Sequence, residues 1–94
     1  MKQVQVFSFR LYISGSAPNS LLAKANLATL CSGYLAGCHQ VEIIDLLQEP
    51  ERALADGVYM TPTLVKIAPL PEVRFVGSLS NSAPIVATLG LKST

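Results

Sequence analysis

The sequence predicts one α/β domain over residues 1–94, with a central mixed sheet and helices on both faces. Three observations support this fold class. Apolar residues alternate at strand spacing in the first segment, recur at helix spacing in the second and run almost uninterrupted in the third. A strand, a helix and a strand in succession form a βαβ unit, so the two strands are expected to be parallel with a right-handed crossover. A chain of 94 residues is long enough for one hydrophobic core.

The first half of the chain accounts for the βαβ unit. Val4 to Ile13 is predicted to be a strand that ends before Pro18, and Asn19 or Ser16 is expected to cap the following helix. Val41 to Leu47 is predicted to be a second strand, and its apolar run suggests burial on both faces. Between them a helix should bury one stripe at spacings of three and four: Ala23, Leu27, Leu30, Cys31 and Tyr34.

The second half predicts a short helix, a hairpin and a last helix. The short helix begins at residues 49–52, where a proline and acidic residues suit a first turn, and it ends at Gly57. Two strands, Leu64 to Ile67 and Val73 to Val76, flank a short proline-rich connection and should be antiparallel. Asn81 is expected to cap the last helix. The resulting β-α-β-α-β-β-α order is that of a thioredoxin-like fold.

Composition excludes several classes of function. Seven basic and six acidic residues give a net charge of +1, and the basic residues are dispersed, which argues against nucleic-acid binding. No apolar run reaches the ~18 residues of a membrane span, and the first residues lack the apolar region of a signal peptide. A soluble, cytoplasmic protein with apolar surface available to a protein partner is expected.

Candidate catalytic and metal-binding groups are few. Cys31 and Cys38 are seven positions apart, which is not a C-x-x-C spacing, and His39 does not complete a zinc set. Both thiols are expected to be reduced packing groups. Asp45 could act as a carboxylate beside His39, but an acid at a strand end more often caps a turn. The sequence therefore predicts no enzyme, no catalytic site, no metal and no cofactor.

Several short motifs, in register from Leu11 to Asn81, resemble those of the KaiB family. Each is short, but together they cover most of the chain. They are LYISG at 11–15 with PNS at 18–20, IDLL at 44–47 with Pro50, TPTLVK at 61–66, and Pro69, Pro71, Arg74, Gly77, Leu79, Ser80 and Asn81.

This resemblance implies a non-enzymatic clock adaptor. KaiB-like proteins bind the amino-terminal ATPase ring of KaiC, modulate its phosphorylation cycle and help to sequester KaiA. The resemblance also implies a metamorphic protein, with a tetrameric ground-state fold and a monomeric thioredoxin-like fold that binds KaiC. It places the partner-binding surface on the edge of the second strand, at Gln40, Val41, Glu42 and Ile43. Lys66 and Arg74 in the hairpin are further partner-binding candidates.

Particular positions carry the remaining expectations. Pro62 stands where thioredoxin-like proteins have a cis-proline, so the bond before it is predicted to be cis. The loop at 15–20, where redox thioredoxins carry two cysteines, has none, which excludes dithiol exchange.

Four positions depart from the typical clock protein. Glu42 and Gly57 replace lysines, and Thr88 and Gly90 replace a glycine and an aspartate in the fold-switch region. Because little chain follows Leu91, the monomeric thioredoxin-like state is expected. These departures also motivate an alternative function, a divergent KaiB-like protein in stress or kinase signalling outside the clock.

Overall fold

The computed structural model describes residues 5–91, and it has the predicted order of strands and helices. The sheet order is β2-β1-β3-β4, with β1 parallel to β2 and antiparallel to β3, and β3 antiparallel to β4. The sheet is therefore mixed, as predicted. Its elements are β1 (Phe7–Ile13), α1 (Pro18–Tyr34), β2 (His39–Asp45), α2 (Pro50–Ala55), β3 (Thr63–Ala68), β4 (Val73–Val76) and α3 (Ala83–Leu89).

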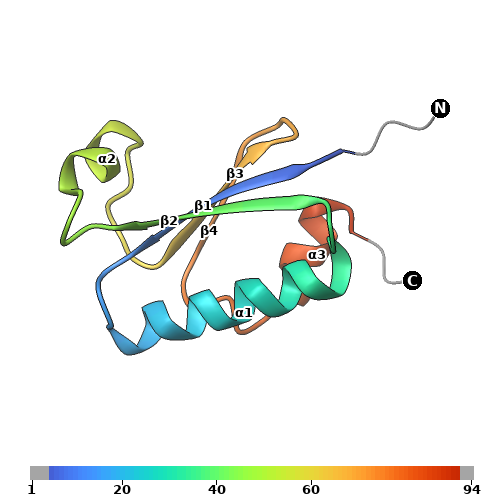
Figure 1. Ribbon diagram of the computed structural model, residues 1–94, viewed down its shortest axis with the longest axis horizontal. Coiled ribbons are helices and arrows are strands. Elements are labelled where there is room, and N and C mark those ends of the chain that lie inside the picture. The colour runs from blue at the N-terminus through green and yellow to red at the C-terminus, as the bar shows by residue number, and fades with distance from the viewer. Residues whose placement is uncertain (1–4, 92–94) are drawn as a thin grey trace.

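Helices cover both faces of the sheet. Side chains alternate between the two faces along β1, and each face carries apolar side chains that a helix buries. Phe9, Leu11 and Ile13 pack with α1, α3 and Leu64 into the larger core. Tyr12 points to the opposite face and packs with Ile44, Ala53, Val58 and Val65 beneath α2. Figure 1 shows α1 and α3 together on one side of the strands and α2 on the other.

Helix α1 buries the predicted stripe, although it starts differently from expectation. Ala23, Leu27, Leu30 and Cys31 are buried, whereas Tyr34 is only partly so. The N-cap is Ala17, without a side-chain hydrogen bond, and Pro18 stands in the first turn, where its missing N–H costs nothing. Neither Asn19 nor Ser16 caps this helix. Instead the Ser20 hydroxyl accepts a bond from the Ser14 N–H at 3.0 Å.

The two first-half strands differ from prediction in extent and burial. β1 begins at Phe7, later than predicted, and Val4 lies outside the described residues. β2 covers 39–45 rather than 41–47, and the prediction that it is buried on both faces is wrong. It is an edge strand whose positions 40–43 are all exposed, and only Ile44 is fully buried. A run of apolar residues does not distinguish a central strand from an edge strand that leaves apolar surface open.

Helix α3 occupies the predicted fold-switch segment. Ser82, rather than Asn81, is its N-cap, and Ile85 and Leu89 are buried as predicted. Thr88 lies within the helix, and Gly90 ends it with a φ of 69°. This left-handed conformation favours glycine over the residue types that carry a Cβ. The bond from the Leu91 N–H to the Val86 carbonyl, at 3.0 Å, completes the helix end.

The Thr61–Pro62 peptide bond is cis, as the sequence predicts. Two further bonds, Ala68–Pro69 and Leu70–Pro71, are also cis and were not expected from the sequence. Within residues 5–91, no helix combines the length and the apolar character that crossing a membrane requires.

Candidate partner-binding edge

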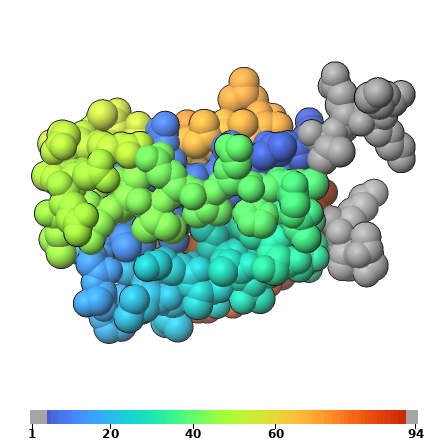
Figure 2. Space-filling view, viewed as in Figure 1, coloured from blue at the N-terminus to red at the C-terminus, as the bar shows by residue number. Residues whose placement is uncertain are grey.

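Strand β2 leaves half of its backbone hydrogen-bonding groups directed out of the sheet. The Phe7 N–H donates to the Cys38 carbonyl and the Leu46 N–H donates to the Ile13 carbonyl, both at 2.9 Å. In a parallel ladder every second residue bonds to the same neighbour, so even-numbered residues of β2 face β1. Val41 and Ile43 therefore direct their N–H and C=O groups outward. Figure 2 shows β2, in green, running uncovered across the front of the molecule.

The outward residues of β2 also open an apolar groove against α1. Their register with Phe9 and Leu11 places Val41 and Ile43 on the α1 face of the sheet. They are 39% and 40% exposed, because α1 does not extend over them. The groove has a volume of about 380 Å³, and its lining residues are Lys24, Leu27, Ala28, Cys31, His39, Val41 and Ile43. An unpaired edge beside an apolar groove suits an added strand with apolar side chains.

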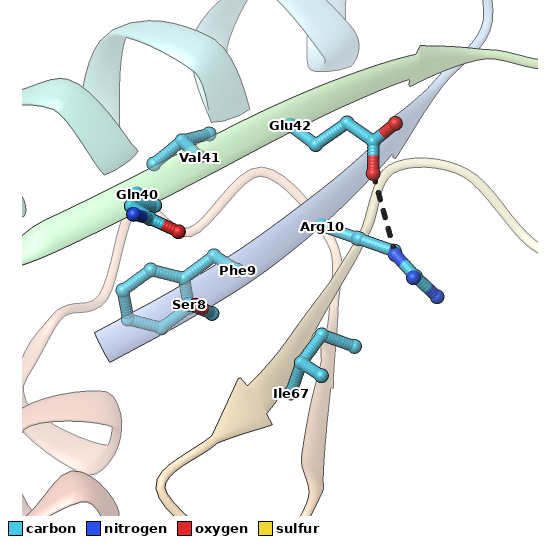
Figure 3. Close-up of a pocket in the computed structure, with 7 residues that line it drawn as sticks. All are labelled: Ser8, Phe9, Arg10, Gln40, Val41, Glu42 and Ile67. Atoms are coloured by element: carbon cyan, nitrogen blue, oxygen red, sulfur yellow. Dashed lines mark ion pairs between the residues drawn. The ribbon is translucent and has the colours of Figure 1, made fainter. Parts of the chain in front are cut away.

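The opposite side of the same strand carries charge. Gln40 and Glu42 lie on the α2 face, opposite Ser8 and Arg10 of β1. They line an open concavity of about 360 Å³, in which Glu42 and Arg10 approach each other (Figure 3). The predicted residues Gln40–Ile43 therefore lie together on one edge but divide between two chemically different faces.

Glu42 is held by two arginines. Its carboxylate accepts hydrogen bonds from Nη1 and Nη2 of Arg52 on α2, at 2.5 and 3.0 Å, and lies 3.4 Å from Nε of Arg10. The bidentate bond from Arg52 is the main reason that the pKa of Glu42 lies below its ordinary value. The same bond raises the pKa of Arg52. Glu42 is ionised at neutral pH, and its charge is balanced within the chain.

Asp56, at the end of α2, is a second centre of the same charged face. Its carboxylate oxygen Oδ2 accepts a 3.0 Å bond from Nη1 of Arg10 and a hydrogen bond from the Tyr12 hydroxyl. Tyr12 is fully buried, so Asp56 supplies the partner that this hydroxyl needs. The arrangement fastens the end of α2 to the middle of the sheet.

Arg74, a predicted partner-binding residue, also belongs to this attachment. Its guanidinium donates to the backbone carbonyl of Gly57, at 3.1 Å, and to that of Asp56. It retains 38% side-chain exposure and lies 3.7 Å from Glu72. Gly57 has a φ of 66°, a conformation that a lysine at this position would adopt only at a cost. Arg74 therefore connects β4 with the end of α2.

Lys66 does not lie at the accessible surface expected of a partner-binding residue. It is 5% exposed and faces the α1 side of the sheet, opposite Phe9. Its Nζ lies 5.9 Å from the centroid of the Phe7 ring, within the range of a cation–π contact. The aliphatic stem is packed in the fold, as long cationic side chains allow. Lys66 is therefore too buried to form part of the candidate surface.

The remaining polar candidates have structural roles. Asp45 caps the turn after β2, because its Oδ1 accepts bonds from the N–H groups of Gly15 and Leu47 at 3.0 and 2.9 Å. Cys31 and Cys38 are unbonded thiols, and burial raises the pKa of the Cys31 thiol to about 11. Neither lies at the start of α1, where dithiol chemistry would need them. Across residues 5–91, no three histidine, cysteine or acidic side chains group into a potential metal site.

Sequence reasoning missed the residues that organise the charged face: Arg10, Tyr12, Arg52 and Asp56. They come from β1 and α2, and only the strand register and the position of α2 bring them together. The one available signal was the placement of Arg10 and Tyr12 at alternate positions of a predicted strand. The residues that bond to Arg10 and Tyr12 could not be predicted without the structure.

Comparison with known proteins identifies close sequence relatives. The KaiB domain matches residues 10–91 of this chain. The circadian clock protein KaiB3 of Synechocystis sp. is 39% identical over 82 residues, which cover 87% of this chain and 80% of that protein. The circadian clock oscillator protein KaiB of Synechococcus elongatus is 33% identical over 91 residues, covering 97% and 89% respectively.

Solved structures with low sequence identity share the fold. The N-terminal domain of Synechococcus elongatus SasA matches with a TM-score of 0.76 at 18% identity, over 95% of this chain and 84% of that domain. Chloroplastic thioredoxin z matches with a TM-score of 0.74 at 21% identity, over 92% of this chain and 80% of its own. These likenesses confirm the thioredoxin-like fold.

Proposed function

The chain belongs to the KaiB family, and we propose that it is a clock adaptor that binds a KaiC-like ATPase ring through its β2 edge and modulates the ring's phosphorylation cycle. The curated relatives are named as clock proteins and not as enzymes, so the proposal includes no catalytic step. The observation that carries it is the uncovered edge at Val41 and Ile43, where outward backbone groups adjoin an apolar groove.

The physical basis is strand addition. A partner strand would satisfy the outward N–H and C=O groups of β2 and bury the exposed side chains of Val41 and Ile43 against α1. Backbone bonds supply affinity, whereas the groove selects apolar side chains at alternate positions. Gln40 and Glu42 would border the same partner on the α2 face. Arg74 would contribute by holding α2 in place.

The proposed binding state is a monomer with the thioredoxin-like fold. A helix at 83–89 satisfies its own backbone, whereas the tetrameric ground-state fold implied by family resemblance would use this segment differently. KaiA is the second partner proposed for the same state. Light scattering during gel filtration would give about 10.0 kDa for the binding species. A ring-binding species of tetramer mass would overturn this part of the proposal.

Titration of a fluorescent chain with the amino-terminal KaiC ring tests the main proposal. Ile43→Asp places a carboxylate on the apolar side of the edge, so we expect at least a tenfold weaker affinity. Leu70→Asp is the matched control, because Leu70 is 82% exposed in the β3–β4 turn and remote from β2 in the sheet order. We expect its affinity to stay within twofold of the unmodified chain.

Two outcomes would contradict the proposal. One is that the unmodified chain binds neither the ring nor a phosphomimetic form of it. The other is that Ile43→Asp and Leu70→Asp weaken binding equally. Binding to a sensor kinase in place of the ring would favour the alternative role in signalling outside the clock.

A further inference from the structure

Helix α2 and the β2 edge are joined through one carboxylate. Glu42 projects from β2 toward α2, where Arg52 forms a bidentate bond with it, and Arg10 lies against the same carboxylate. Arg10 in turn bonds to Asp56 at the end of α2. We infer that Glu42 couples the β2 edge to the position of α2 on the sheet, so that a partner that places a lysine or arginine opposite Glu42 loosens the helix.

Apart from Arg74, which bonds to the carbonyls at its end, helix α2 has few other contacts that hold it. It has six residues, which is too short to be stable without tertiary contacts. Only Ala53 of this helix is buried, and Leu54 is 70% exposed. The bonds of Arg52 to Glu42, and of Asp56 to Arg10 and Tyr12, therefore form a large part of its attachment. A short helix held by polar contacts belongs to the least stable part of a fold.

The sign of the coupling follows from charge. A lysine or arginine of a partner placed opposite Glu42 competes with Arg52 and Arg10, so α2 is released from its pairing. Coupling between two sites is reciprocal. A chain in which α2 has already detached from Glu42 should therefore bind such a cation more tightly. A partner that is neutral at this position leaves the cluster intact. Glu42 thus holds α2 in position, and α2 responds to a cationic partner but not to a neutral one.

Amide hydrogen exchange in the free protein tests the internal part of this inference. The probes are the Asp56, Gly57 and Val58 N–H groups, which donate to the backbone carbonyls at positions 52–54 of α2. Glu42→Gln and Arg52→Gln should each accelerate their exchange about two- to fivefold, as for a partly exposed pair within a network. The double variant should exchange no faster than the faster single variant.

Two controls accompany this double-mutant cycle of Glu42→Gln and Arg52→Gln. The Val86 and Gly90 amides of α3 should not change in any variant, because α3 lies on the opposite face of the sheet. Glu51→Gln removes another carboxylate of α2, one without an ion pair within the described residues. Its cycle with Arg52→Gln should be additive. Unchanged exchange in the single variants, or additive effects of Glu42→Gln and Arg52→Gln, would overturn the coupling.

The part of the inference that concerns the partner rests on the proposed function and is tested by a separate exchange measurement. A KaiC ring that binds this edge with a lysine or arginine opposite Glu42, as we infer, should accelerate α2 exchange at least twofold more in the unmodified chain than in Glu42→Gln. Equal changes in the two chains would overturn the coupling to the partner. If the unmodified chain binds no ring, the proposed function fails, whereas the double-variant cycle still decides whether Glu42 and α2 are coupled.

Discussion

Tyr12 and Asp56 share a hydrogen bond that is partly buried, and replacing one or the other should destabilise the fold by different amounts. Tyr12 is fully buried, and its hydroxyl bonds to Asp56. Tyr12→Phe removes the hydroxyl donor and, with it, the cost of burying that hydroxyl. We therefore expect a loss of about 1.5 kcal/mol in the free energy of unfolding. Asp56→Ala leaves the buried hydroxyl without this acceptor and Arg10 without one of its two carboxylates, which should cost about 2–3 kcal/mol.

Urea unfolding followed by circular dichroism measures both losses, at two protein concentrations to detect association. For a domain of this size, 1.5 kcal/mol corresponds to a fall of about 6–12 °C in Tm. Asp56→Asn is the control, because its amide oxygen retains an acceptor for Tyr12, and it should cost less than Asp56→Ala. The double variant of Tyr12→Phe and Asp56→Ala should cost about 1 kcal/mol less than the sum. Additive losses, or a smaller loss for Asp56→Ala than for Tyr12→Phe, would refute the reasoning.

Three further predictions concern charge and thiol chemistry. Because the folded pKa of Glu42 lies below its ordinary 4.5, the stability from its pairing is complete above about pH 4.5 and is lost as pH falls through the lowered pKa. Urea titrations across that range should show a flatter acid limb for Glu42→Gln than for the unmodified chain. Iodoacetamide at pH 8 should modify Cys38 before Cys31, whose thiol is buried and has a pKa of about 11, as mass spectrometry of timed samples would reveal; equal rates would contradict the packing. Arg74→Ala should cost about 0.5–1 kcal/mol in urea unfolding through its lost bonds to two carbonyls, and Arg74→Lys should recover less than half.

Local sequence patterns predicted the elements but not how they associate. The alternation around Leu11 and the helix-spaced stripe around Leu27 record which side of an element is buried, and both agree with the structure. The apolar residues of β2 carried no such information, because Val41 and Ile43 remain partly exposed at the edge of the sheet. An open apolar edge and a buried strand have the same local pattern.

The candidate surface was only partly predictable for a related reason. The family resemblance implied Gln40–Ile43, and the structure places these residues at an uncovered edge. The cluster around Glu42 depends on the register that sets Arg10 opposite it, which is a long-range property. Lys66 illustrates the converse. A lysine in a hairpin is usually solvated, but Lys66 lies opposite Phe9 on the α1 face of the sheet and is buried there.

The amide exchange of Val41 and Ile43 tests the central claim most directly. Both N–H groups point away from β1, so they should exchange rapidly in the free chain, whereas the Gln40 and Glu42 amides should be protected. With the KaiC ring bound, the Val41 and Ile43 amides should slow at least tenfold, because the added strand accepts their hydrogen bonds. Ring binding that leaves these two amides as fast as in the free chain would contradict docking at the β2 edge.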